Sequence, residues 1–177
     1  MTGKAIGLSF NIGYAGTPSR EGKNAPEIVN LPVKSDSTTI LFGEPVVLNT
    51  DNTVSSVKDV TLTAANFLGI AVAETKTNLT FPLPYGTAET SGSYLAGEPI
   101  DVMQTGTICV QVVGTPTAGG AVYVRTALAT AFPDEEIGQI RTAADGGNTV
   151  QLTNCSFKTN RVDANGITEL FVRFPVN

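Results

Sequence analysis

Apolar residues recur along this chain in short runs that are separated by Gly, Pro, Asn and Asp. Ile108, Val110 and Val112 alternate with other residues, which is the period of a strand with one buried face. The run 67–73 is apolar apart from its glycine and predicts a buried strand. Clusters of turn-forming residues follow such runs, at 49–52, 114–120, 145–148 and 163–166.

The spacing of these runs indicates the fold class. Short strands recur about every 8–15 residues, and no long amphipathic helix lies between them. This pattern predicts an all-β domain, either an antiparallel β-sandwich of jelly-roll-like form or a small β-barrel. Residues 75–95 are rich in Thr, Pro, Gly and Ser, and we expect them to form a long surface loop.

The first 39 residues differ in character from the rest. Ile6, Leu8, Phe10, Ile12 and Tyr14 alternate with other residues, mostly Gly, Ser and Asn, which is a strand signal. About 20 irregular residues follow before the next clear strand, and such a stretch is uncommon inside a compact domain. We therefore expect residues 1–39 to form an extended N-terminal arm that another surface orders, and residues 40–177 to form the β-domain.

One local pattern occurs twice. Residues 43–48, GEPVVL, resemble residues 97–102, GEPIDV, and each copy follows apolar residues. Glycine permits a backbone bend, and proline suits the first residue of a strand, where no ladder donor is needed. Residues 68–71 and 137–140 share a similar glycine-containing string. Either the fold contains two similar β-units, or both places use common strand-entry chemistry.

Composition and charge exclude several function classes. The 177 residues include no His, no Trp and 2 Cys, and the formal net charge is −5. Without His there is no Ser-His-Asp or Cys-His catalysis, and two cysteines are too few for a four-cysteine zinc site. An acidic chain lacks the basic stripe of nucleic-acid-binding proteins, and no run of 18 apolar residues predicts a membrane span. We therefore expect no catalytic residues, no cofactor, no metal and no nucleic-acid or membrane partner.

The charged residues fit structural roles. Glu44 and Glu98 could form the carboxylate pair of a glycosidase. Both lie in the repeated Gly-Glu-Pro element, however, so matching roles in two turns explain them better. The acidic run 134–136 is expected in a solvated loop, and Arg125 and Arg141 are expected on solvated faces.

The two cysteines are expected to be buried thiols. Two cysteines do not make a disulfide scaffold in a chain of this size. A catalytic thiol would need a base, and His is absent. Cys109 and Cys155 therefore fit the role of small apolar side chains, with a disulfide as the alternative.

Several strings of residues, taken in order, resemble one known family. Each string combines turn and strand-entry residues, and together they extend over nearly the whole chain. They are NIGYAGTPSR (11–20), FGEPVV (42–47), FLGIAV (67–72), YLAGEPIDV (94–102), GTPTAGGAVYVR (114–125), FKT (157–159) and VDANG (162–166). In this order they resemble the structural cement, or head decoration, proteins of tailed bacteriophages.

The resemblance implies a non-enzymatic virion protein that binds the outer surface of the capsid. Such a protein clamps neighbouring subunits of the major capsid protein, and it is usually a homo-oligomer, with a trimer favoured and a dimer as the alternative. The acidic composition fits an exterior location away from packaged DNA. A long arm fits a clamp, because it can cover a large area with little mass.

The arm supplies the candidate contacts with the capsid or with another protomer. They are Phe10, Ile12, Tyr14, Arg20 and Ile28. The alternative function is a carbohydrate-binding or adhesive β-module of a tail fibre or cell surface. The absence of Trp and the small number of Phe and Tyr count against the exposed aromatic patch that such a module needs. A more distant alternative is a glycosidase or depolymerase that uses the two glutamates of the repeated element.

Overall fold

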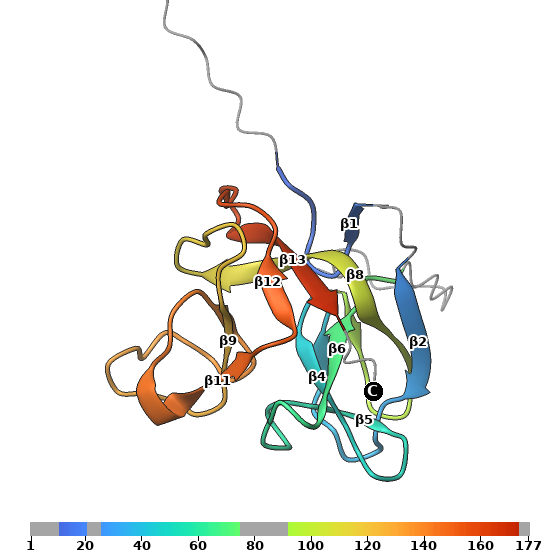
Figure 1. Cartoon of the computed structure of the whole chain (residues 1–177). Helices are drawn as coiled ribbons and strands as arrows, with labels where there is room; N and C mark the ends of the chain where they lie inside the picture. Colours follow the sequence, from blue (N-terminus) through green and yellow to red (C-terminus); the bar gives the residue numbers. More distant parts are fainter. Residues whose placement is uncertain (1–10, 21–25, 75–91, 174–177) are drawn as a thin grey trace, which may run out of the picture.

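The chain folds into strands joined by turns and loops (Figure 1). The structure, a computed structural model, describes residues 11–20, 26–74 and 92–173. In these ranges one short 3-10 helix, Gly146–Asn148, accompanies the strands, so the predicted all-β fold is confirmed. The strands are β1 (Pro18–Arg20), β2 (Glu27–Pro32), β3 (Ile40–Leu41), β4 (Pro45–Leu48), β5 (Val54–Ser56), β6 (Phe67–Ala71), β7 (Ser93–Tyr94), β8 (Pro99–Val113), β9 (Val122–Arg125), β10 (Ile140–Arg141), β11 (Thr149–Leu152), β12 (Cys155–Phe157) and β13 (Ile167–Arg173).

The long strand β8 lies at the centre of the main sheet (Figure 1). Within the described residues this sheet has 11 strands, and its main path runs β11-β9-β10-β8-β6-β4-β5. In addition, β13 pairs with β8 and β12, while β1 and β2 pair with β8. Because β10 runs parallel to β8 and the other pairs are antiparallel, the sheet is mixed. It is not closed, so the fold is sandwich-like rather than a barrel.

Apolar side chains cover both faces of the central strands. Residues of β6 divide between two buried clusters, with Phe67 and Ile70 in the larger one and Leu68 and Ala71 in the smaller one. Strict alternation is interrupted because the register with β4 shifts between Gly69 and Phe67. Strands β9 to β13 complete the larger cluster, while Val33 and the short β3–β7 ladder complete the smaller one. A strand buried on both faces carries a continuous apolar run, which is why no alternation is seen at 67–73.

Residues from the expected arm pair with β8. Strands β1 and β2 run antiparallel to it, with Pro18 opposite Ile108 and Pro32 opposite Pro99. Val33, which follows β2, is buried in the smaller cluster. That this part of the chain also reaches toward another surface stays a prediction. Of the loop expected at 75–95, Ser93–Tyr94 form β7, and 75–91 lie outside the described residues.

The repeated Gly-Glu-Pro element forms the same hydrogen-bonded turn twice. The Leu41 carbonyl accepts the N–H of Glu44 at 3.2 Å, and the Leu95 carbonyl accepts that of Glu98 at 3.1 Å. Each glutamate carboxylate in turn accepts the N–H of the same leucine, at 2.9 Å and 2.8 Å. The two glutamates therefore have the matching structural roles that the repeat predicts.

The glycine in each turn has the backbone conformation of a type II turn. Its φ is 82° at Gly43 and 81° at Gly97, in the left-handed region that the third residue of such a turn requires. The turns are joined through β3 and β7, which place Ile40 opposite Tyr94. Since these two residues occupy the same place in the repeat, a local twofold relates the two turns.

The second glycine-containing string does not extend this likeness. Gly69 lies inside β6, whereas Gly138 precedes β10. The repeat is therefore structural in the turns and ends there.

Arg125 and Arg141 are buried and share two carboxylates, so the expectation that they are solvated is wrong. Arg125 is 0% exposed, its Nε lies 2.7 Å from Glu135 Oε2, and its Nη1 lies 3.0 Å from Asp145 Oδ2. Arg141 pairs with the same carboxylates, at 3.2 Å and 3.7 Å. The ring of Phe132 stacks against both guanidinium groups.

We call Arg125, Glu135, Arg141 and Asp145 the ion-pair clasp. The clasp holds together the two ends of the loop 126–139, because Arg125 is the last residue of β9, before the loop, and Arg141 lies in β10, after it. Glu135 is therefore an exception to the prediction that the acidic run 134–136 is solvated. Its neighbours, at 134 and 136, are exposed as expected.

Both cysteines are buried free thiols. Burial raises the pKa of Cys155 to about 12, and burial is also the main cause of the raised pKa of Cys109. Both thiols are therefore protonated at neutral pH and pack as small apolar side chains, which is the first of the two expected states.

We predict that Glu135→Gln destabilises the protein by about 3 kcal/mol. The substitution removes a charge shared by two buried guanidinium groups and leaves them with Asp145 alone. Urea unfolding followed by circular dichroism measures the change in the free energy of unfolding. The matched control, Asp134→Asn, removes an exposed charge from the same loop and should cost less than about 0.5 kcal/mol. Equal effects of the two substitutions would contradict the role of the clasp.

Candidate functional site

Residues 12–17, which we call the N-terminal strap, lie across β8 and lead into β1. The N–H of Gly16 donates to the Cys109 carbonyl, and the N–H of Cys109 donates to the Thr17 carbonyl, both at 2.8 Å. On its other side the strap contacts the chain just after β6, where the N–H of Ala73 donates to the Gly16 carbonyl at 2.8 Å. The strap therefore bridges two neighbouring strands of the sheet.

A turn within the strap presents Tyr14 to solvent. The N–H of Thr17 donates to the Tyr14 carbonyl at 3.1 Å, and Gly16 has a φ of 82°. This is again the geometry of a type II turn. The Tyr14 residue is 78% exposed. An aromatic side chain is thus displayed from a backbone that hydrogen bonds hold in place.

Asp163, in the turn before β13, holds the beginning of the strap. Its Oδ2 accepts the N–H of Ile12 at 3.0 Å, while its Oδ1 accepts those of Asn165 and Ile167 at 2.9 Å and 3.0 Å. Burial raises the pKa of Asp163, but the N–H groups of Ile167, Ile12 and Asn165 together bring it below the ordinary value of 3.8. The carboxylate is therefore ionised at neutral pH.

The strap packs backbone to backbone against the first Gly-Glu-Pro turn. A Cβ atom placed on Gly43 would lie 2.9 Å from both Ala15 Cβ and Gly16 N. A Cβ atom placed on Gly97, in the second turn, would meet nothing within 4 Å. The two turns have the same conformation, but only the glycine of the first turn is in close contact with the strap.

The structure places the predicted contact residues as follows. Ile12 and Tyr14 lie in the strap, and Arg20 lies in β1, so these three follow one another along β8. Ile28 lies farther along β8, in β2, and is 41% exposed. Phe10 lies outside the described residues. Contact of these residues with another protein stays a prediction.

Sequence reasoning missed the supports of the strap. The turn residues around Asp163 indicate a local role only, and its bond to Ile12 spans 151 positions of the chain. The one available signal was the repeat, since it marks Gly43 as a turn residue. The contact between that turn and the strap has no signature in the sequence.

Two kinds of site were sought among the described residues. Among them no group of three or more His, Cys, Asp or Glu is placed to hold a metal ion. In the same part of the chain no helix has the length and apolar character needed to cross a membrane. The carboxylates of Glu44 and Glu98 are each engaged by the N–H of their own turn.

The sequence matches the model of one protein family. The model described as structural cement protein (E217 gp24/Pam3 gp6) matches residues 3–173. The chain belongs to the structural cement protein family. The resemblance seen in the ordered strings of residues is thereby confirmed. No curated protein sequence matches the chain.

A solved structure contains a chain of the same fold. A chain in the structure titled "The capsid of Myoviridae Phage XM1" has a TM-score of 0.64 to this chain and 14% sequence identity. The match covers 97% of this chain and 96% of that chain. At this identity the likeness establishes the fold alone.

Family membership supports a coarse statement of function. A structural cement protein of a bacteriophage has a capsid-associated structural role, and the family implies no enzymatic activity. The strap and its exposed tyrosine are therefore considered below as parts of a binding surface.

The paired substitutions Gly43→Ala and Gly97→Ala test how the strap is held. Both introduce a Cβ at a positive φ, which costs about 1 kcal/mol. Gly43→Ala also forces a clash with Gly16, so we expect it to cost at least about 1 kcal/mol more. Cys109 Sγ lies beneath the strap, so its alkylation in the native protein should be faster in Gly43→Ala alone. Urea unfolding and mass spectrometry measure the two effects, and an equal or larger effect of Gly97→Ala would contradict the contact.

We predict that Asp163→Asn destabilises the protein at neutral pH and has a smaller effect in acid. The folded pKa of Asp163 lies below 3.8, so its contribution to stability is fully present above that value and is lost as pH falls through the folded pKa. The difference in the free energy of unfolding between wild type and variant, measured in urea at a series of pH values, should shrink below 3.8. A difference that stays constant over this series would show that the charge of Asp163 has no such role.

Proposed function

We propose that this protein binds the outer surface of the assembled phage capsid and clamps neighbouring subunits of the major capsid protein. The observation that carries the proposal is the strap, which displays Tyr14 at 78% exposure from a hydrogen-bonded turn. Tyrosine is among the side chains that most often dominate binding energy at protein interfaces. A backbone that is ordered before binding loses little entropy when the partner arrives.

The contact surface extends from the strap along β1 and β2. Ile28 in β2 is 41% exposed, although most apolar residues of the described sheet are buried. Strands β1 and β2 both pair with β8, so Tyr14 and Ile28 are held by the same strand. A contact that used both residues would engage an extended stretch of the capsid, as a clamp between subunits requires.

Charge and family together support the location and the assembly. A protein of net charge −5 is repelled by packaged DNA and suits the outside of the capsid. Capsid lattices present symmetric sets of sites, and a homo-oligomer, with a trimer favoured, matches such a set. The function needs no cofactor and no metal.

Tyr14→Ala tests the proposal. We expect it to weaken binding to capsids that lack the protein by roughly 30-fold, the effect of losing about 2 kcal/mol at an interface hot spot. Titration of the purified protein onto such capsids, followed by sedimentation and quantification of the bound fraction, measures the affinity. Capsids that carry the bound protein should also withstand a higher temperature than capsids that lack it before they release DNA.

Leu128→Ala is the matched control. Leu128 is 69% exposed in the loop 126–139, which lies outside the strap and β2. Its removal should leave both capsid occupancy and capsid heat resistance unchanged. Occupancy by Tyr14→Ala equal to that of the wild type would contradict the strap's role, and failure of the wild type to bind would contradict the proposed function.

A further inference from the structure

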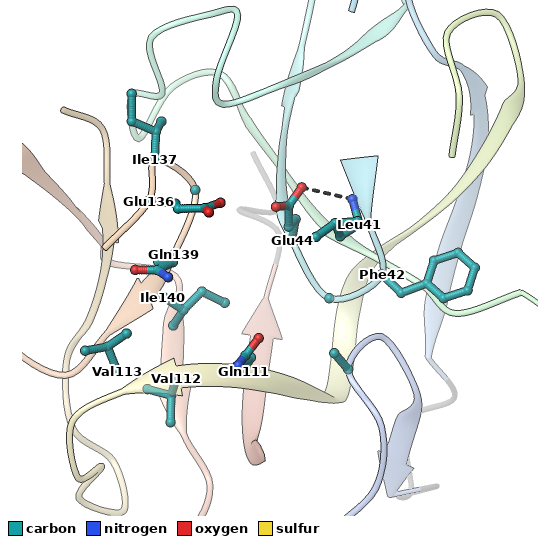
Figure 2. A pocket seen from close by; sticks show the side chains of 13 residues that line it. Leu41, Phe42, Glu44, Gln111, Val112, Val113, Glu136, Ile137, Gln139 and Ile140 are labelled. Atoms are coloured by element: carbon teal, nitrogen blue, oxygen red, sulfur yellow. Dashed lines mark hydrogen bonds between the residues drawn. The ribbon is translucent and has the colours of Figure 1, made fainter. Parts of the chain in front are cut away.

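A pocket opens beside the strap, between two segments that are distant in the sequence. The first Gly-Glu-Pro turn, residues 41–44, forms one side and residues 136–140 form the other (Figure 2). Residues 111–113 of β8 form the floor, and Ala15 of the strap reaches the rim. The pocket volume is about 150 Å³, which is sufficient for one large side chain or a small ring.

The pocket combines apolar walls with oxygen atoms. Leu41 and Ile140 are among the apolar residues that line it. Figure 2 shows the carboxylates of Glu44 and Glu136 on facing sides, pointing toward one another. A long basic side chain has the matching form, because its methylene stem packs on apolar walls while its charged head binds carboxylates.

The charges in the pocket are not balanced by the described residues. Glu44 is paired with Lys58, with 3.2 Å between Nζ and Oε1. Glu136 is exposed and has no ion-pair partner among the described residues. The lining therefore keeps one negative charge without a cation.

We propose that this pocket receives one long basic side chain, lysine or arginine, from a protein of the capsid; the proposal rests on the proposed function. The pocket adjoins the strap through Ala15, next to Tyr14, so both would belong to one continuous contact surface. Tyr14 supplies an aromatic anchor at the surface, and the pocket supplies selection for positive charge. The acidic side of the interface thereby lies on this protein and the basic side on the capsid.

Glu136→Gln tests the proposal, with Asp134→Asn as the matched control. Both substitutions remove one exposed negative charge from the same loop, but only residue 136 lines the pocket. We expect Glu136→Gln to weaken binding to capsids that lack the protein by about tenfold or more, and Glu136→Lys to weaken it further. Asp134→Asn should bind as the wild type does. The loss in Glu136→Gln should diminish as salt is raised, since salt screens the lost attraction.

Each outcome of this experiment has a distinct meaning. Equal affinities of Glu136→Gln and Asp134→Asn, with normal binding by the wild type, would overturn the pocket and leave the proposed function intact. No binding by the wild type would overturn both. The oligomeric mass of the unbound protein in solution is a further readout. If Glu136→Gln changes this mass and leaves the capsid affinity unchanged, a second copy of this chain occupies the pocket, and the proposal is overturned. Unchanged thermal unfolding of the variants excludes misfolding as the cause.

Discussion

The architecture depends on the pairing of β8. This strand, Pro99–Val113, pairs with five other strands in the described part of the chain, and the strap bonds to it as well. Its first half lies between β2 and β6, and its second half lies between β1 and β13. Each of these pairings joins segments far apart in the sequence, so β8 is where the N-terminal, central and C-terminal parts of the chain meet.

This shared strand explains how a surface feature can be rigid. The strap is short and half of its residues are Gly or Thr, so it could not bury enough apolar area to hold itself in place. It is held instead by main-chain hydrogen bonds to β8, by the hydrogen bond from Ile12 to Asp163, and by close packing on Gly43. The pocket follows from the same arrangement, because its floor is the end of β8 and its rim includes the strap. Binding surface and core are therefore linked through one strand.

Much of the fold could be predicted from the sequence, because strands and turns have local signals. Alternation in β8 and β13, the apolar run of β6 and the Gly-Glu-Pro repeat each led to the observed element. The repeat also explained Glu44 and Glu98 correctly, since a type II turn needs its glycine and the carboxylate caps the turn. Strand β2 was missed as part of the sheet, because Asn30 and Pro32 weaken its strand signal.

The features that the sequence did not reveal depend on distant partners. Arg125 and Arg141 look like ordinary surface residues until the fold brings β9 beside β10 and supplies Glu135 and Asp145. The pocket likewise combines residues from four separate segments, none of which carries a motif for it. Tyr14 was selected from its alternation with glycine and asparagine, and the turn that exposes it became visible in the structure.

Hydrogen–deuterium exchange of the free and the capsid-bound protein would locate the binding surface, because it reports where the chain is covered without altering any residue. Peptides from residues 12–20, 26–32 and 136–140 should exchange more slowly once the protein is bound. Peptides from β11, on the far side of the sheet path, should exchange as before. Protection confined to β11 or to residues 126–135, with none in the strap, would show that the strap is not part of the capsid-binding surface.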